Sequence, residues 1–281
     1  IGKDPATMVP VNALGTRALL AACCNNGIRR FVFSSSVAVY SPHPLPRMWP
    51  IREDTSLQPH GSELLYSYGQ SKIQAESFVT EAHRARGLDY VILRAAMTYG
   101  PGINYIERFV WLTLRQVMLG RRAALSRAYM QWIHVDDFVE ALLLAADGPA
   151  AANQIFVIAG EEVVTPLDVL DALNECLLPA QPQSAAPRAN ARALGPRYDI
   201  SKARALLGFA PRVRFHDGIR DVLTGMNLGP IPPDTYSDSA MPGRRAGWPQ
   251  LPGFDDNVPG RGVERRGLDD SLIRVGADAF A

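Results

Sequence analysis

Three features are missing from this chain: a block of like charges, an apolar run of membrane-spanning length and a cysteine framework. With 29 Lys and Arg against 28 Asp and Glu, the formal net charge is +1, and the scattered charges argue against a nucleic-acid partner. With no apolar run and no signal peptide ahead of the first expected helix, we expect a cytoplasmic protein without a membrane partner. Cys23, Cys24 and Cys176 have no disulfide or metal spacing, which indicates small buried residues in a reducing compartment and no metal site.

The composition is that of an ordinary soluble globular protein. Apolar residues make up 47% of the chain and charged residues 20%. Its 281 residues would suffice for one large domain or two small ones.

The most informative motif is a tyrosine four residues ahead of a lysine, Tyr68 and Lys72. They open a run with helical spacing of its apolar residues, so both side chains lie on one helix face. A neighbouring ammonium favours the phenolate, and we expect Lys72 to lower the pKa of Tyr68 from about 10 toward neutrality. Such a tyrosine can exchange a proton with a substrate hydroxyl, as alcohol and ketone interconversion requires. The alternative is that both residues are simply exposed on an amphipathic helix.

A second motif is a short apolar run, starting at Arg30, that ends in three serines. A buried parallel strand delivers its last residues to the carboxyl edge of a sheet, where sites in doubly wound folds are built. We therefore expect Ser36 to meet Tyr68 across a cleft.

Five motifs in this order resemble the extended short-chain dehydrogenase/reductases. More narrowly, the chain resembles the NAD-dependent epimerase/dehydratase group, with the 3β-hydroxysteroid dehydrogenases as neighbours. The motifs are Val11-Asn12-Ala13-Leu14-Gly15-Thr16, Phe31-Val32-Phe33-Ser34-Ser35-Ser36 with Val39-Tyr40, Tyr68-Gly69-Gln70-Ser71-Lys72, Leu93-Arg94 with Tyr99-Gly100-Pro101-Gly102, and Ile133-His134-Val135-Asp136-Asp137. Their order along the chain makes coincidence hard to defend.

The resemblance implies an α/β fold, a Rossmann-like doubly wound parallel sheet, and NAD or NADP as cofactor. It also implies an opening strand and a glycine-rich turn for the pyrophosphate, and neither is in this sequence. We therefore expect a sheet that lacks its first strands, either as a fragment or because the protein begins upstream.

The resemblance also assigns the site residues. Ser36, Tyr68 and Lys72 would be catalytic. Tyr68, Lys72, Val11 and Ala96 would contact the cofactor, although Val11 and Asn12 could instead pack their helix on the sheet. The substrate would meet Ser36, Met97, Met130 and Arg197.

Three departures from the resemblance bear on substrate and reaction. Met97 stands where sugar-nucleotide enzymes often carry Asn, and Met130 where they commonly carry a phosphate-binding Arg. These methionines indicate a less charged, more hydrophobic substrate, or they only fill gaps in the core. Val37 and Ala38 follow Ser36 where dehydratases carry an Asp-Glu pair, so water elimination by that route is not expected.

His134, Asp136 and Asp137 invite a catalytic or metal assignment, but we expect a structural role. In the resembled family this motif turns a strand into a helix, with Asp capping the free amides and His packing beneath.

The remaining chain alternates helices and strands up to two last short helices, 199–208 and 215–226. A mobile loop is expected at 179–196 and a long loop bordering the cleft at 41–62. We divide the chain into a partial NAD(P)-binding domain with a small substrate-binding portion, 1–229, and a disordered Pro/Gly-rich tail, 230–281.

The sequence thus predicts an NAD(P)-dependent oxidoreductase or epimerase that acts on a secondary alcohol or ketone. The small-molecule substrate would be a nucleotide sugar or a more hydrophobic compound such as a sterol. Family members commonly form homodimers through two large helices. The alternatives are a non-catalytic cofactor-binding or scaffold protein, and an inactive gene fragment.

Overall fold

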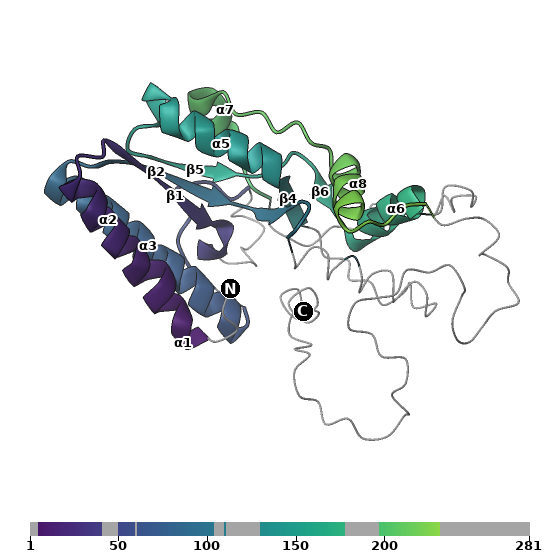
Figure 1. Cartoon of the computed structure of the whole chain (residues 1–281), viewed down its shortest axis with the longest axis horizontal. Coiled ribbons are helices and arrows are strands. Elements are labelled where there is room, and N and C mark those ends of the chain that lie inside the picture. The colour runs from purple at the N-terminus through teal and green to yellow at the C-terminus, as the bar shows by residue number, and fades with distance from the viewer. Residues whose placement is uncertain are drawn as a thin grey trace, which may run out of the picture.

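The computed structural model describes residues 5–40, 50–59, 61–103, 110, 130–177 and 197–230. Figure 1 shows the arrangement of the elements, which are in chain order α1 (Pro5–Met8), η1 (Val9–Leu14), α2 (Gly15–Asn25), β1 (Arg30–Ser36), η2 (Val37–Val39), α3 (Glu63–Arg86), β2 (Asp89–Ala95), β3 (Met97–Tyr99), β4 (Met130–His134), α5 (Val135–Asp147), η5 (Pro149–Ala151), β5 (Gln154–Ile158), β6 (Val163–Val164), α6 (Pro166–Leu177), α7 (Ser201–Leu207) and α8 (Phe215–Gly225).

The central sheet is parallel, with strand order β1-β2-β5. Its strands are apolar on both faces because helices cover both: α2 and α3 lie on one side, α5 and α7 on the other (Figure 1). Val91, Ile92 and Leu93 of β2 are fully buried. This sandwich confirms the predicted α/β fold with a Rossmann-like, doubly wound sheet.

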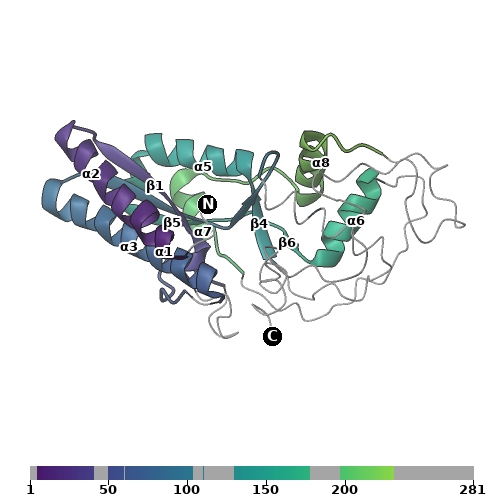
Figure 2. The same ribbon diagram turned by 60° about the horizontal axis from the view of Figure 1, so that its bottom comes forward.

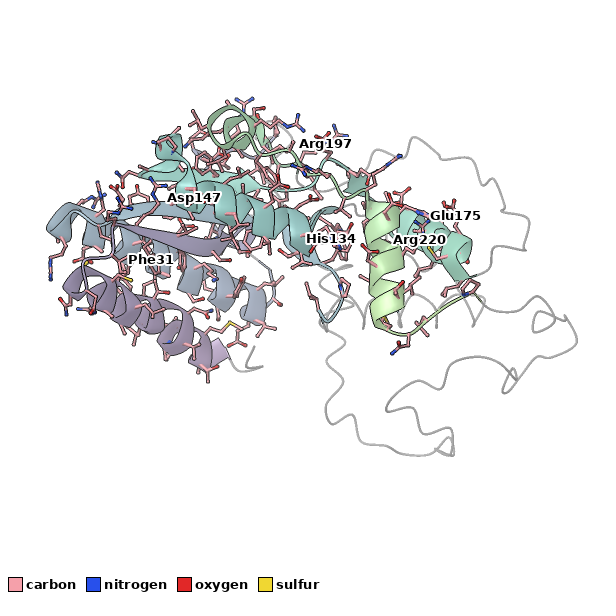
Figure 3. The ribbon with its side chains drawn as sticks, turned by 45° about the horizontal axis from the view of Figure 1, so that its top comes forward. Phe31, His134, Asp147, Glu175, Arg197 and Arg220 are labelled. Carbon is pink, nitrogen blue, oxygen red and sulfur yellow. The ribbon has the colours of Figure 1, made fainter. Side chains whose placement is uncertain are left out.

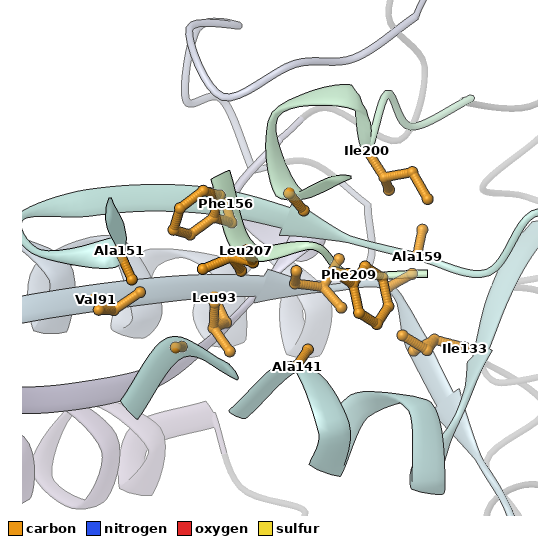
Figure 4. Packing of buried hydrophobic residues seen from close by; sticks show 14 residues of the cluster. Val91, Leu93, Ile133, Ala141, Ala151, Phe156, Ala159, Ile200, Leu207 and Phe209 are labelled. Atoms are coloured by element: carbon orange, nitrogen blue, oxygen red, sulfur yellow. The ribbon is translucent and has the colours of Figure 1, made fainter. Parts of the chain in front are cut away.

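Two apolar clusters hold these layers together. One fills the space between the sheet, α5 and α7, where Phe156, Phe209 and Leu93 meet (Figure 4). The other joins the opposite face to α2 and α3 through Phe33, Ile92 and other side chains. This packing places the carboxyl ends of β1 and β2 beside α3.

A second sheet, of order β3-β4-β6, lies beside the first together with α6 and α8 (Figure 2). Its core contains the rings of Tyr99, Trp132 and Phe215, whose centroids lie 5.4 to 5.9 Å apart. Gly218 of α8 packs directly on Tyr99, because a Cβ there would lie 2.4 Å from the tyrosine hydroxyl oxygen. This sheet and its helices form the small portion expected after the nucleotide-binding layers.

The first helical segment runs from Pro5 to Asn25, through α1, a π-helical turn in η1, and α2. Among the described residues, Ala6–Asn25 is long and apolar enough to cross a membrane by length and composition alone, with 22% of it buried. The sequence-based statement that no apolar run approaches that length is therefore wrong for this segment. Core helices of soluble proteins pass the same test.

Other expected boundaries agree to within a few residues, as in α7 and α8. Gly87, with φ 70°, ends α3 in the left-handed conformation that glycine adopts readily. The loop 179–196, His43, His60 and all but the first residue of the tail 230–281 lie outside the described residues, so the division at 229 stays a prediction.

Candidate active site

The candidate site is built where α3 crosses the carboxyl end of β1. Ser62 caps α3 by accepting a hydrogen bond from the backbone N–H of Leu65 at 3.4 Å, and the helix then carries Tyr68 and Lys72 one turn apart. Gly69 permits the close approach of α3 to η2. A Cβ at this position would lie 2.4 Å from the carbonyl oxygen of Ala38 and 2.5 Å from Cβ of Pro59.

The hydroxyl of Ser36 interacts with the phenol of Tyr68 and opposes the rise in its pKa. The Ser36 Oγ accepts a hydrogen bond from the backbone N–H of Ala38, at 3.2 Å, which orients it at the strand end. The structure therefore brings Ser36 and Tyr68 together, while the catalytic roles of both residues stay predictions.

Lys72 completes the group. Its Nζ donates a hydrogen bond to the carbonyl oxygen of Ser34 at 2.9 Å and lies 5.7 Å from the ring centroid of Tyr68 and 5.1 Å from that of Phe33. Burial lowers the pKa of Lys72, and the negative charge of Glu76 opposes that effect.

The expected effect of Lys72 on Tyr68 is corrected by the structure. Burial raises the pKa of Tyr68, and the hydrogen bond from Ser36 opposes the rise only in part. The amine of Lys72 lies over the face of the phenol ring and bonds a backbone carbonyl, and the pKa of Tyr68 is raised despite the nearness of this amine. Tyr68 is consequently set up as a proton donor.

An open groove of about 560 Å³ adjoins Lys72. It is lined by Val11, Asn12, Gly15, Thr16, Ala18, Leu19 and Lys72. Val11 is 69% exposed, which speaks against the alternative that it packs the helix on the sheet. Asn12 does join the helices, since its Nδ2 donates to Oγ of Ser71 at 3.0 Å.

The other predicted site residues lie at the strand ends. Ala96 is buried just after β2 and donates its N–H to the carbonyl of Ile158 at 2.8 Å, while Met97 of β3 is 39% exposed. The backbone of Met130 pairs with Val164; its side chain lies outside the described part of the chain. Arg197 accepts the N–H of Ile51 through its carbonyl (Figure 3). Within the described contacts, these residues have none to Ser36, Tyr68 or Lys72.

The His134 motif joins β4 to α5, the structural role that the resemblance implies. His134, 2% exposed at the start of α5 (Figure 3), caps the helix because its Nδ1 accepts the N–H of Asp136 at 3.4 Å. Asp137 instead accepts the N–H groups of Arg212 and Val213. The expectation that Asp would be the cap is therefore wrong in detail. The described residues contain no His, Cys, Asp or Glu cluster that could hold a metal.

The sequence analysis missed a buried ionic cluster behind the site. Arg94 of β2 holds Glu76 of α3 with two hydrogen bonds, Nη2 to Oε2 at 2.7 Å and Nε to Oε1 at 3.0 Å. Ser35 donates its hydroxyl to Oε1 of Glu76 at 2.6 Å, and Arg94 Nη1 reaches the hydroxyl of Tyr40 at 2.7 Å. The available signal was an Arg ending an apolar strand and a Glu four residues after Lys72.

The fold is that of a Rossmann-like protein, and it brings Ser36, Tyr68 and Lys72 to the carboxyl end of β1, where their catalytic roles stay a prediction. The model of the NAD dependent epimerase/dehydratase family matches residues 2–159, and the chain belongs to that family.

Individual relatives are more distant. The chain is 30% identical over 218 residues to the dTDP-glucose 4,6-dehydratase of Streptomyces niveus, which covers 76% of this chain and 62% of that protein. It is 25% identical over 206 residues to cinnamoyl-CoA reductase 1 of Oryza sativa, over 73% of this chain and 60% of the relative. Both relatives are matched over less than two thirds of their length.

Among solved structures, RMD from Pseudomonas aeruginosa complexed with NADPH has a similar fold. Its TM-score is 0.64 at 19% identity, covering 79% of this chain and 75% of that one.

Proposed function

We propose that this protein is an NAD(P)-dependent oxidoreductase or epimerase that acts on a secondary alcohol or ketone. The observation that carries the proposal is the placement of Ser36 beside Tyr68 at the strand end, with Lys72 one helical turn away facing an open groove. Family membership supports the same chemistry.

The groove suits the nicotinamide end of a dinucleotide. Val11 presents an exposed apolar wall, and Lys72 offers an ammonium that can donate to ribose hydroxyls. Ala96, buried at the end of β2, would border the same cofactor. Bound there, NAD or NADP would supply or accept the hydride.

Proton transfer is carried out by Tyr68, with Ser36 and Lys72 assisting. In reduction, Tyr68 donates its phenolic proton to the carbonyl oxygen of the substrate, and Ser36 hydrogen-bonds that oxygen. The raised pKa of Tyr68 keeps this proton in place until the substrate accepts it. In oxidation the phenolate form of Tyr68 accepts the hydroxyl proton of the substrate, and the charged amine of Lys72 stabilises that phenolate.

The substrate is proposed from side-chain chemistry. Exposed Met97 is only a weak hydrogen-bond acceptor, and together with Met130 it favours a less charged, more hydrophobic substrate over a nucleotide sugar. If the substrate is a nucleotide sugar, Arg197 would contact its phosphate. Val37 and Ala38 after Ser36 leave no carboxylate for water elimination, although one relative is a dehydratase. Simple hydride transfer, or transfer out and back with inversion, is proposed instead.

One observation favours the second candidate, a chain that keeps the fold without turning over substrate. Among the described strands, β1 pairs only with β2, and Val11, Leu14 and Leu19 of the neighbouring helix are exposed. The cytoplasmic location and a homodimer through the long helices α2 and α3 also stay predictions.

Calorimetric titration of NAD and NADP, followed by activity assays, separates the candidates. Saturable micromolar binding that weakens on Lys72→Ala, together with turnover, supports the enzyme, and such binding without turnover supports the non-catalytic cofactor-binding protein. Absence of binding to the folded wild-type chain supports an inactive fragment. Substrate class then follows from activity assays with nucleotide sugars and with hydrophobic secondary alcohols, using Met97→Asn as the variant expected to shift preference toward the sugars.

A further inference from the structure

Three consecutive residues of β1 hold three successive turns of α3. The hydroxyl of Ser36 interacts with Tyr68, the carbonyl of Ser34 accepts a hydrogen bond from Lys72, and the hydroxyl of Ser35 donates one to Glu76. The three helix residues are spaced four apart, so they form one stripe along α3. Two of these contacts belong to the proposed active site, and the third, at Glu76, has no role in it yet.

Glu76 is 5% exposed, and both oxygens of its carboxylate accept hydrogen bonds from residues of β1 and β2. One oxygen accepts from Ser35 and from Nε of Arg94, and the other accepts from Nη2 of Arg94. A carboxylate held by a bidentate guanidinium has a defined orientation. The contact therefore fixes the rotation of α3 on β1 and β2 one turn beyond Lys72.

We propose that Glu76 is a positioning residue for the proposed reaction: anchored by Arg94 and Ser35, it orients the face of α3 that bears Tyr68 and Lys72 and holds a carboxylate one helical turn from Lys72.

Of Arg94 and Lys72, the two cations that interact with Glu76, only Lys72 can readily lose its proton. Arg94 stays charged in any protein environment, whereas a buried lysine readily becomes neutral. Without the carboxylate, Lys72 would lose the opposite charge of Glu76, and its proton would be held less tightly. Among the described residues, Tyr68 on α3 is the other titratable group that faces Lys72, and the described groove lining from η1 and α2 adds none. Near the Glu76–Arg94 pair the further titratable groups are Lys72, Tyr40 and Glu53, whose backbone carbonyl accepts a hydrogen bond from Arg94 Nη1 at 2.9 Å.

The test reads Lys72 directly, without turnover. The sequence contains three lysines, Lys3, Lys72 and Lys202, so protein labelled with 13C at lysine Cε gives few signals to titrate by NMR. Glu76→Gln should lower the titration midpoint of Lys72 by about one pH unit, the size expected for losing an opposite charge one turn away. Lys202, which donates to the carbonyl of Ile155 on β5, should keep its midpoint. An unchanged Lys72 midpoint in the folded variant overturns the proposal.

A charge cycle keeps the test decisive if Glu76→Gln fails to fold. The double variant Glu76→Gln/Arg94→Met removes both buried charges, and its Lys72 midpoint should lie below that of Arg94→Met alone. Equal midpoints in these two proteins would count against Glu76.

Two control variants complete the test. Glu76→Asp should restore part of the wild-type midpoint of Lys72. Asp137→Asn removes another buried carboxylate, on α5, and should leave Lys72 unchanged; a similar fall there would assign the effect to general loosening.

Activity provides the second readout. In Glu76→Gln, kcat should fall with KM nearly unchanged, and its pH profile should move in the same direction as the Lys72 midpoint. If the protein proves to bind no dinucleotide, the proposed function fails while the NMR titration still decides the role of Glu76. If activity is present but the profile stays fixed, the positioning role is wrong.

Discussion

The side-chain amine of Lys72 donates a hydrogen bond to the carbonyl oxygen of Ser34, 2.9 Å away. This bond joins the helix that carries the phenol to the strand that ends in its partner, Ser36. Lys72 therefore has a defined place before any ligand arrives, and substitutions on either element should act on the same site.

Tyr68→Phe should abolish most turnover while leaving the fold intact. The phenol is the proposed proton donor, and loss of such a group costs roughly 10²- to 10⁴-fold in rate. Steady-state kinetics with a carbonyl substrate and circular dichroism measure the two effects. Tyr66→Phe is the matched control, because Tyr66 lies on the same helix with its side chain 48% exposed. Full activity in Tyr68→Phe would refute the assignment.

Gly69→Ala should destabilise the protein and impair the site together. The added Cβ would meet the Ala38 carbonyl and Pro59, neither of which is the end of a flexible chain, so α3 must move away from η2. Overpacking of this kind costs about 1–3 kcal/mol. Urea unfolding measures it. Gly229→Ala, where a Cβ meets nothing within 4 Å, should be near neutral and serves as the control.

Arg30→Met should weaken the end of α5. The Arg30 Nη1 donates to the carbonyl oxygens of Ala145, Ala146 and Gly148 at 2.8 to 3.1 Å, and of these Gly148 also accepts the N–H of Ala151. Loss of charged hydrogen bonds of this kind costs about 1.5–3 kcal/mol. The free energy of unfolding should fall by that order, and the neighbouring Arg29→Met, on an exposed residue, should change it far less.

Stability should fall as the pH rises above 10. Burial raises the pKa of Tyr40 from its usual 10.0 to about 12, and it raises the pKa values of Tyr99 and Tyr198 as well. Between the unfolded and folded pKa values the folded chain keeps a proton that the unfolded chain releases. Each such group therefore lowers the free energy of unfolding by up to about 1.4 kcal/mol per pH unit.

Urea titrations between about pH 9 and pH 11 measure this slope, in the window set by the raised tyrosine pKa values. Tyr198→Phe removes one of the buried phenols while keeping the ring, and its slope should be shallower than that of the wild type. A slope unchanged by this substitution would show that Tyr198 titrates alike in both states.

Local patterns were enough to predict much of the fold. The apolar runs of β1 and β2 and the amphipathic spacing after Tyr68 depend only on neighbours along the chain, and so does the glycine that ends α3. Spacing alone also placed Tyr68 and Lys72 on one helix face. Motif order pointed to the family, and through the strand end it pointed to the meeting of Ser36 with Tyr68.

Other features needed the folded chain. The direction in which the pKa of Tyr68 shifts depends on how deeply the phenol is buried. The prediction from sequence considered the nearby charge of Lys72 but not this burial. His134 caps α5, whereas Asp137 accepts a hydrogen bond from the backbone N–H of Arg212, 75 residues away in the chain.

The sequence by itself determined which residues form the strands and helices, and which of them carry a phenol, an amine and a hydroxyl. Only the tertiary structure decided that Glu76 meets Arg94, 18 residues away, and Ser35, 41 residues away, and that Tyr68 keeps its proton. The reason is physical: propensity and periodicity act between neighbours in the chain, whereas desolvation and ion pairing depend on what distant segments bring to the same place.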